Sequence, residues 1–175
     1  HRVTVLFAVP TMFQMMLDAP EFASASLDSV RFFISGGAAC PIPLIEAWQQ
    51  RGVVFKQGYG LTEVGPNCFV LHERDAIRKA GSVGHPVLHL DTRLVDATNR
   101  EVPVGEVGEL QLRGPTVCAG YWRNPDATAA AQSDDGWFAT GDLFRKDDEG
   151  YHYVVGRLKE MYISGGENVY PAEVE

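Results

Sequence analysis

The first 57 residues alternate between short apolar runs and segments with helical spacing. The apolar runs are typical of buried strands and lie at residues 3–9, 31–35 and 53–57. A helix is expected from Pro10, which suits a first helical turn, and a second over residues 41–50, with Gly52 near its C-terminal cap. This order of strand, helix and strand predicts an α/β layer with a parallel sheet.

After Gly81 the pattern changes to short β-like runs punctuated by glycine and proline, at residues 92–96, 109–113, 144–146 and 151–155. No long helical period appears among them. We expect a small β-rich subdomain, barrel-like or sheet-like, in which residues 147–150 form a hairpin turn. The predicted units are residues 1–80 (α/β part of a large domain), 81–157 (β-rich subdomain) and 158–175 (connector).

The charge distribution agrees with a change of unit near residue 80. The net charge of −8 comes from 15 basic and 23 acidic side chains; residues 1–80 hold equal numbers, so residues 81–175 carry the whole excess. An acidic balance without a cluster of Lys and Arg argues against a partner that is nucleic acid or an anionic membrane.

Composition restricts the class of protein further. A chain of 175 residues, 45% of them hydrophobic, suits one globular unit or one unit and part of another. No apolar stretch approaches the roughly 20 residues of a membrane-spanning helix. Three widely spaced cysteines without a CxxC pair disfavour disulfides and zinc and favour a reducing cytoplasm. The chain starts in mid-pattern at His1 and stops at Glu175 as a helical pattern begins, so we expect a fragment.

The segment Gly58–Glu63 follows a predicted strand and combines three chemical groups. It is neither a dinucleotide fingerprint, because Glu63 occupies the third glycine position, nor a Walker A loop. The ring of Tyr59 could stack on a base, the hydroxyl of Thr62 could donate to a phosphate, and the Glu63 carboxylate could bind Mg²⁺. The alternative is a turn with a polar helix start.

Three other segments allow ligand contacts. Residues 35–38 lie between a strand and a helix, where backbone can approach an anion, or they are a plain tight turn. Residues 137–142 end a β-like run at Asp142. The two carboxylate oxygens of Asp142 match the vicinal hydroxyls of a ribose; the alternative is that Asp142 stabilises a turn. Arg157 and Lys159 place two cations at the start of the connector, where they could contact a ligand. The alternative is that both are solvated surface charges.

Taken together, six segments resemble the adenylate-forming (AMP-binding) superfamily, in the expected order and over essentially the whole chain: residues 35–38, 58–63, 120–128, 137–142, 156–159 and 164–171. The last segment looks most like the branch of acyl-CoA synthetases and fatty-acid–CoA ligases. The resemblance implies an acid–thiol ligase of the cytoplasm. Such an enzyme uses ATP and Mg²⁺ to convert a carboxylic acid, for example in fatty acid metabolism, into acyl-AMP, and transfers the acyl group to coenzyme A.

The resemblance also implies individual roles. Thr62 and Glu63 would act in catalysis, with Thr62 at the α-phosphate and Glu63 on Mg²⁺, and Lys159 would be the hinge to a C-terminal lid domain that begins within residues 158–175. The expected nucleotide- and cofactor-binding residues, which include Asp142 on the ribose and two glycines at the thiol tunnel, are Gly36, Gly37, Ala38, Gly58, Tyr59, Thr62, Asp142, Arg157, Gly165 and Gly166.

Two functional parts of the superfamily are expected outside this chain, the phosphate-binding loop upstream and the lid lysine downstream. The isolated chain is therefore expected to be inactive. The alternatives are an adenylation domain that loads a carrier protein and a nucleotide-binding fragment without activity of its own. The sequence identifies neither the carboxylic acid nor the oligomeric state.

Overall fold

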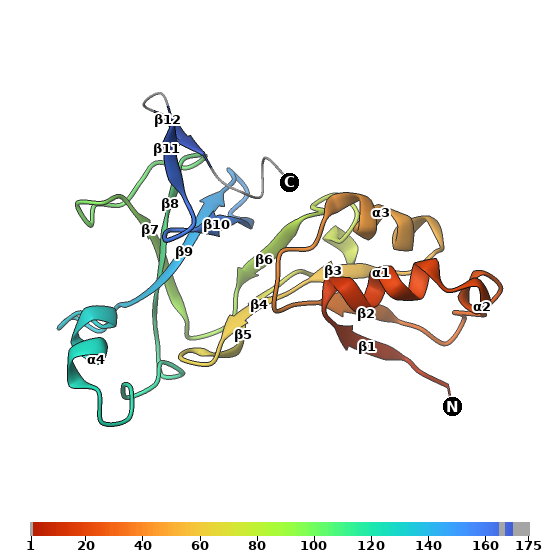
Figure 1. Cartoon of the computed structure of the whole chain (residues 1–175), viewed down its shortest axis with the longest axis horizontal. Coiled ribbons are helices and arrows are strands. Elements are labelled where there is room, and N and C mark those ends of the chain that lie inside the picture. Colours follow the sequence, from red (N-terminus) through yellow and green to blue (C-terminus); the bar gives the residue numbers. More distant parts are fainter. Residues whose placement is uncertain (1, 165–166, 170–175) are drawn as a thin grey trace.

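The computed structural model describes residues 2–164 and 167–169, and the N-terminal part of these is an α/β layer (Figure 1). Its three strands are parallel and lie side by side in the order β1 (Val5–Ala8), β2 (Phe32–Ser35) and β3 (Phe55–Gln57). The helices are α1 (Pro10–Asp18), the short α2 (Pro20–Ala23) and α3 (Ile42–Gln50). The predicted parallel α/β layer is confirmed.

Aromatic side chains fix this layer. Phe13 of α1, Phe33 of β2 and Trp48 of α3 are fully buried, with ring centroids 5.1–6.1 Å apart. Both helices therefore cover the same face of the sheet, and burial of each ring contributes about 1.5–3 kcal/mol. This core holds the carboxyl ends of β2 and β3 in place, and with them the two loops that follow.

The second sheet is antiparallel throughout and has seven strands in the order β4-β5-β6-β10-β9-β8-β7. Its strands are β4 (Tyr59–Leu61), β5 (Gly65–Val70), β6 (Ser82–Pro86), β7 (Asp91–Val95), β8 (Val107–Arg113), β9 (Phe138–Lys146) and β10 (His152–Arg157). A 3₁₀ turn, η1 (Glu73–Asp75), precedes β6. The β-rich subdomain is confirmed, and residues 147–150 form the expected turn between β9 and β10.

Several details differ from the sequence-based expectation. Among the described residues the second sheet is open, with β4 and β7 at its edges, so no closed barrel forms. It takes β4 and β5 from residues 1–80, because the segment after Gly58 forms an antiparallel hairpin rather than a helix start. A short helix, α4 (Pro125–Ala131), interrupts the β-rich part. After β10, two short strands pair antiparallel, β11 (Tyr162–Ser164) and β12 (Glu167–Val169).

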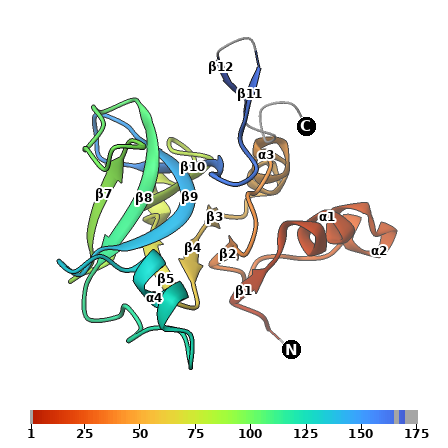
Figure 2. The ribbon, with the colours of Figure 1, turned by 60° about the vertical axis from the view of Figure 1, so that its left-hand side comes forward.

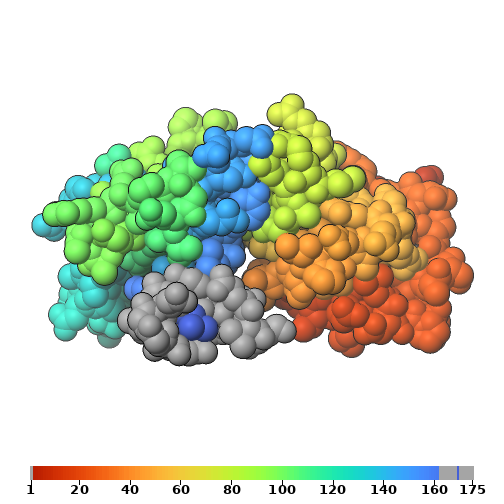
Figure 3. Space-filling model, turned by 90° about the horizontal axis from the view of Figure 1, so that it is seen from above, coloured from red at the N-terminus to blue at the C-terminus, as the bar shows by residue number. Residues whose placement is uncertain are grey.

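The two sheets adjoin in the middle of the molecule, where β6 contacts β3 and where only Gly58 separates β3 from β4 (Figures 1 and 2). In Figure 3 the α/β layer forms the red-to-orange end and the antiparallel sheet the green-to-blue end. Lys79, in the segment before β6, contacts Asp147 and Glu149 of the β9–β10 turn at 2.6 and 2.7 Å.

Within the described ranges no helix is long and apolar enough to cross a membrane.

Candidate functional site

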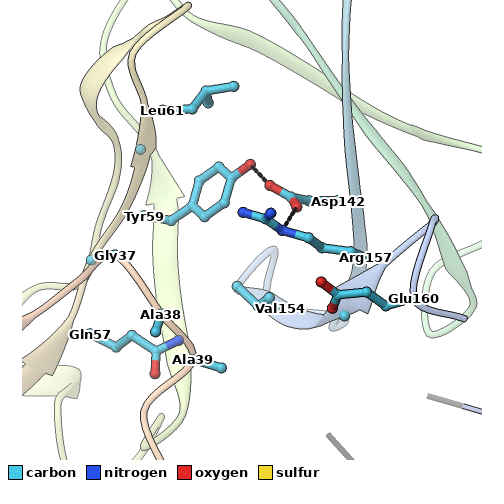
Figure 4. Close-up of a pocket in the computed structure, with 13 residues that line it drawn as sticks. Gly37, Ala38, Ala39, Gln57, Tyr59, Leu61, Asp142, Val154, Arg157 and Glu160 are labelled. Carbon is cyan, nitrogen blue, oxygen red and sulfur yellow. Dashed lines mark hydrogen bonds and ion pairs between the residues drawn. The ribbon is translucent and has the colours of Figure 1, made fainter. Parts of the chain in front are cut away.

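A cavity of about 390 Å³ lies where the two sheets meet (Figure 4). The loops that follow β2 and β3 form one wall, as expected for a ligand site at the carboxyl ends of parallel strands. Strands β4, β9 and β10 and the turn after β10 form the other. Its lining residues are Gly37, Ala38, Ala39, Gln57, Gly58, Tyr59, Gly60, Leu61, Asp142, Val154, Gly156, Arg157 and Glu160.

Tyr59 and Asp142 meet across this cavity although 83 residues separate them in the chain. The Tyr59 hydroxyl donates to Asp142 Oδ2 at 2.5 Å, and Arg157 Nε lies 3.2 Å from Asp142 Oδ1. The strand pairing explains the second contact, because Arg157 of β10 lies directly opposite Asp142 of β9. Asp142 lies within β9 rather than at the end of a β run, so the expectation of a strand end there is wrong.

The Tyr59 ring is fixed on one side by other aromatic rings. It packs edge-on against Phe144 and Phe69, with centroid distances of 4.8 and 5.9 Å. Burial raises the pKa of the Tyr59 hydroxyl, and the hydrogen bond to Asp142 raises it further, so the hydroxyl remains a donor at physiological pH. The ring is thus held in a single orientation at the cavity wall, which suits stacking on a planar base.

The Asp142 carboxylate retains hydrogen-bonding capacity. Its side chain is 15% exposed, and each oxygen has one of the contacts described above. A carboxylate has about four lone-pair sites, so two vicinal hydroxyls could still donate to it. Arg157 is largely exposed, with 67% of its side-chain surface accessible, so this ion pair adds little stability and can rearrange around a ligand.

Close backbone packing holds the strand that carries Tyr59. A Cβ atom at Gly60 would lie 2.1 Å from the carbonyl oxygen of Pro66 on the facing strand β5. Only glycine allows β4 and β5 to pair at this distance. The glycine after Tyr59 is therefore required for the hairpin that presents the tyrosine ring.

The other predicted residues lie around the cavity or outside the described ranges. Gly36, Thr62, Glu63 and Lys159 are not among the lining residues. Thr62 is exposed at the end of β4, and Lys159 is exposed in the turn after β10. Gly165 and Gly166 lie outside the described residues.

The comparisons with known proteins identify the family. The family model for "AMP-binding enzyme" matches residues 1–122. The chain belongs to this family. It is 48% identical over its whole length to a feruloyl-CoA synthase of Amycolatopsis sp and 44% identical to an indoleacetate–CoA ligase of Aromatoleum aromaticum, covering 35% and 34% of them.

Solved structures give the same family. ATP-bound MatB from Rhodopseudomonas palustris matches with a TM-score of 0.91 and 37% identity, over 99% of this chain and 35% of that one. O-succinylbenzoate coenzyme A synthetase (MenE) from Bacillus subtilis, in complex with ATP and a magnesium ion, matches with a TM-score of 0.88 and 35% identity, over 100% and 36%. The chain thus spans about a third of the length of these relatives.

Glu63, which the sequence predicts as a ligand of Mg²⁺, can be tested against the structure. Glu63 Oε1 accepts a hydrogen bond from the Tyr121 hydroxyl at 2.9 Å, which leaves Oε2 without a hydrogen-bond partner among the described residues. No group of three or more His, Cys, Asp or Glu in the described ranges could hold a metal by itself. One carboxylate oxygen fits Mg²⁺, which is often bound by one or two carboxylates together with substrate phosphates and water.

Seven lining residues were not predicted from the sequence: Ala39, Gln57, Gly60, Leu61, Val154, Gly156 and Glu160. Gly60, Leu61 and Gly156 lie inside recognised motifs but were not assigned a role, and Ala39 and Gln57 each adjoin a motif by one residue. Val154, Gly156 and Glu160 come from β10 and its following turn, and the pairing of β9 with β10 brings this part of the chain beside Asp142. Gln57 is 5% exposed, and its Oε1 accepts from the Cys40 backbone N–H at 3.0 Å, which fixes the loop that holds Ala38 and Ala39.

Proposed function

We propose that the whole protein is an acyl-CoA ligase that activates a carboxylic acid with Mg-ATP and transfers the acyl group to coenzyme A. The observation that carries this proposal is the pairing of the Tyr59 ring with the Asp142 carboxylate across a cavity at the carboxyl ends of β2 and β3. The relatives that match the whole chain are named CoA ligases, which favours CoA over a carrier protein as the thiol acceptor.

In this proposal the chain positions the nucleotide. The Tyr59 ring contacts adenine, the Asp142 oxygens accept from the ribose hydroxyls, and the backbone of Gly36, Gly37, Ala38 and Gly58 borders the base and the acyl group. Arg157 contacts the Asp142 oxygen beside the ribose. Transfer at phosphorus depends mostly on such positioning and on stabilisation of charge.

In the reaction we propose, a carboxylate oxygen of the acid attacks the α-phosphorus of ATP and pyrophosphate leaves, which gives acyl-AMP. The thiol sulfur of CoA then attacks the acyl carbon, and AMP leaves. Thr62 would donate a hydrogen bond to an oxygen of the α-phosphate, and Glu63 would hold Mg²⁺ with the carboxylate oxygen that Tyr121 does not contact. Bound Mg²⁺ would supply positive charge beside the phosphate oxygens.

The second half-reaction is assigned to a movement of the lid. We propose Lys159 as its hinge, because Lys159 lies in the exposed turn directly after β10. Gly165 and Gly166 are proposed to border the path of the thiol. The acid itself stays open, since the relatives are named for aromatic acids and for long-chain fatty acids. A panel of both classes, assayed on the full-length protein, would identify it.

The test of the nucleotide site uses Asp142→Ala and Asp142→Asn in the full-length protein. Each lost hydrogen bond to the charged carboxylate is worth roughly 1.5–3 kcal/mol, so we expect ATP affinity to fall tenfold or more. The Asn variant keeps an acceptor for the Tyr59 hydroxyl. Asp91→Ala removes an exposed ion pair with Arg113 on β8, neither residue of which lines the cavity, and serves as the matched control.

The analogue 2′,3′-dideoxy-ATP, which lacks both hydroxyls, decides the role of Asp142. We expect the wild-type protein and Asp142→Asn to bind it with the same affinity. Equal weakening of ATP and the dideoxy analogue would instead show that Asp142 supports the strand and does not bind ribose. Failure of the wild-type protein to exchange pyrophosphate into ATP with any acid of the panel would contradict the proposed activity.

A further inference from the structure

The segment at residues 118–132 has no role in the function proposed above, although it contains one of the six recognised motifs. It leads from β8 to β9 through α4. Two contacts join it to a single residue of the β4–β5 hairpin. The Tyr121 hydroxyl donates to Glu63 Oε1 at 2.9 Å, and the Cys118 backbone N–H donates to the Glu63 carbonyl at 2.7 Å.

Internal hydrogen bonds aim Tyr121 at Glu63. The Tyr121 backbone N–H donates to Thr128 Oγ1 at 2.9 Å, and the Thr128 hydroxyl donates to the Asn124 carbonyl at 2.9 Å. The Asn124 side chain in turn caps α4 by accepting from the Ala127 N–H at 3.1 Å. Tyr121 is thus attached to a capped helical turn and not to a free loop.

Gly120 makes this arrangement sterically possible. Its φ is +136°, a conformation that favours glycine. A Cβ atom there would lie 2.6 Å from Cγ2 and 2.8 Å from Oγ1 of Thr128. At the other end of α4, Gln132 Nε2 donates to the Cys118 carbonyl at 2.8 Å. The segment is therefore hydrogen-bonded within itself. Its N-terminal half makes two hydrogen bonds to Glu63, and Gln132 at its other end bridges to Phe138 of β9.

We propose that residues 118–132 form a bracket for Glu63, and that Tyr121 is a positioning residue that orients the Glu63 carboxylate for the metal–nucleotide complex. This inference rests on the proposed function, in which Glu63 holds Mg²⁺. A hydrogen bond to Oε1 removes rotamers of the glutamate and leaves Oε2 available. In this proposal four residues of the motif together orient the Glu63 carboxylate: Gly120, Tyr121, Asn124 and Thr128.

The test is Tyr121→Phe in the full-length protein, with Tyr153→Phe as the matched control. Tyr153 also donates its hydroxyl to a carboxylate, Asp147 at 3.1 Å, but in the β9–β10 turn. The measurement is ATP affinity by calorimetry at a series of Mg²⁺ concentrations. Since one hydrogen bond is at stake, we expect Tyr121→Phe to raise the Mg²⁺ concentration for half-maximal tightening roughly three- to tenfold, and Tyr153→Phe to leave it unchanged.

Two further measurements separate positioning from a structural role. ATP affinity without Mg²⁺ should be the same for Tyr121→Phe and wild type. Amide hydrogen exchange should become faster at residues 118–124 in Tyr121→Phe. Thr128→Val removes the acceptor of the Tyr121 N–H, so it should reproduce both the higher Mg²⁺ midpoint and the faster exchange.

An unchanged Mg²⁺ midpoint in Tyr121→Phe overturns the inference, whether or not amide exchange has increased, because the segment is then only a loop anchor. An equal shift in Tyr153→Phe overturns it as well. If the ATP affinity of the wild-type protein does not depend on Mg²⁺, the proposed function itself is contradicted. The wild-type titration alone shows this outcome, so it is distinguished from a failure of the Tyr121 inference.

Discussion

The stability of the second sheet should depend on pH through His152. This residue is 3% exposed at the start of β10, and its ring packs against Phe69 with centroids 4.9 Å apart. Burial, together with a smaller effect of the positive charge of Lys146, lowers the pKa of His152 from 6.5 to about 4. The imidazole is therefore neutral in the folded protein at physiological pH, and its Nδ1 has no hydrogen-bond partner among the described residues.

Proton linkage determines whether acidification raises or lowers the free energy of unfolding. Between pH 6.5 and about 4 the unfolded chain binds a proton at His152 that the folded chain excludes, so acidification favours unfolding. Each pH unit in this window costs about 1.4 kcal/mol, so lowering the pH from 7 to 5 should remove roughly 2 kcal/mol of stability. Carboxylates whose pKa is lowered, such as Asp147 and Glu149, lose their contribution only at lower pH, near and below their ordinary values of 3.8 and 4.5.

The assay compares the free energy of unfolding at pH 7, 6 and 5 for the wild-type chain, His152→Phe and His152→Gln. The two substitutions differ in polarity, so they should change stability at pH 7 by different amounts, yet both should lack the loss of roughly 2 kcal/mol on going to pH 5. Nuclear magnetic resonance of the histidine rings should place the His152 pKa at about 4 directly. If the wild type and both variants lose stability in parallel, His152 does not titrate as its burial requires and the reasoning is refuted.

Two further changes test the site. Gly60→Ala should destabilise the protein by about 2 kcal/mol or more, because its Cβ would lie 2.1 Å from the Pro66 carbonyl, whereas Gly58→Ala meets Ile34 only at 3.4 Å and should lower the melting temperature less. Lys159→Pro should leave ATP affinity nearly intact while slowing at least one half-reaction, because proline fixes φ at about −65° in the proposed hinge, and no backbone hydrogen bond of the Lys159 N–H occurs within the described residues. Wild-type rates for both half-reactions in Lys159→Pro would exclude this hinge.

Local patterns predicted the first layer well, because apolar runs and proline positions fix those elements independently of the rest of the chain. The strand expected at residues 31–35 is observed at Phe32–Ser35, and the helix expected at residues 41–50 is observed at Ile42–Gln50. The strand β9 was underestimated. Its first half contains small and polar residues, Ala139 to Asp142, which weaken the alternating pattern, so the sequence predicts two separate β-like runs, one ending at Asp142 and one at residues 144–146, in place of one strand.

The distances within the site could not be predicted from these patterns. The motifs gave a plausible chemistry to Tyr59 and Asp142, but their contact depends on the strand order, in which β5, β6 and β10 lie between β4 and β9. The contact of Tyr121 with Glu63 likewise depends on the path of a connection that crosses back to another hairpin. Neither contact has a signal in periodicity, since both join residues more than 50 positions apart.

The proposed hinge also has a physical reason to lie at Lys159 and not earlier. Arg157 pairs with Asp142 across β9 and β10, and the Leu158 backbone N–H donates to the Gly141 carbonyl at 2.8 Å. Rotation of the backbone before Leu158 would break both contacts and disturb the carboxylate proposed to hold the ribose. After Leu158, the Glu160 and Met161 N–H groups bond only to the Arg157 carbonyl, at 3.0 Å each, among the described backbone contacts. A rotation centred on Lys159 can therefore exchange two exposed turn bonds for others and move Glu160, while Tyr59, Asp142 and Arg157 keep their contacts.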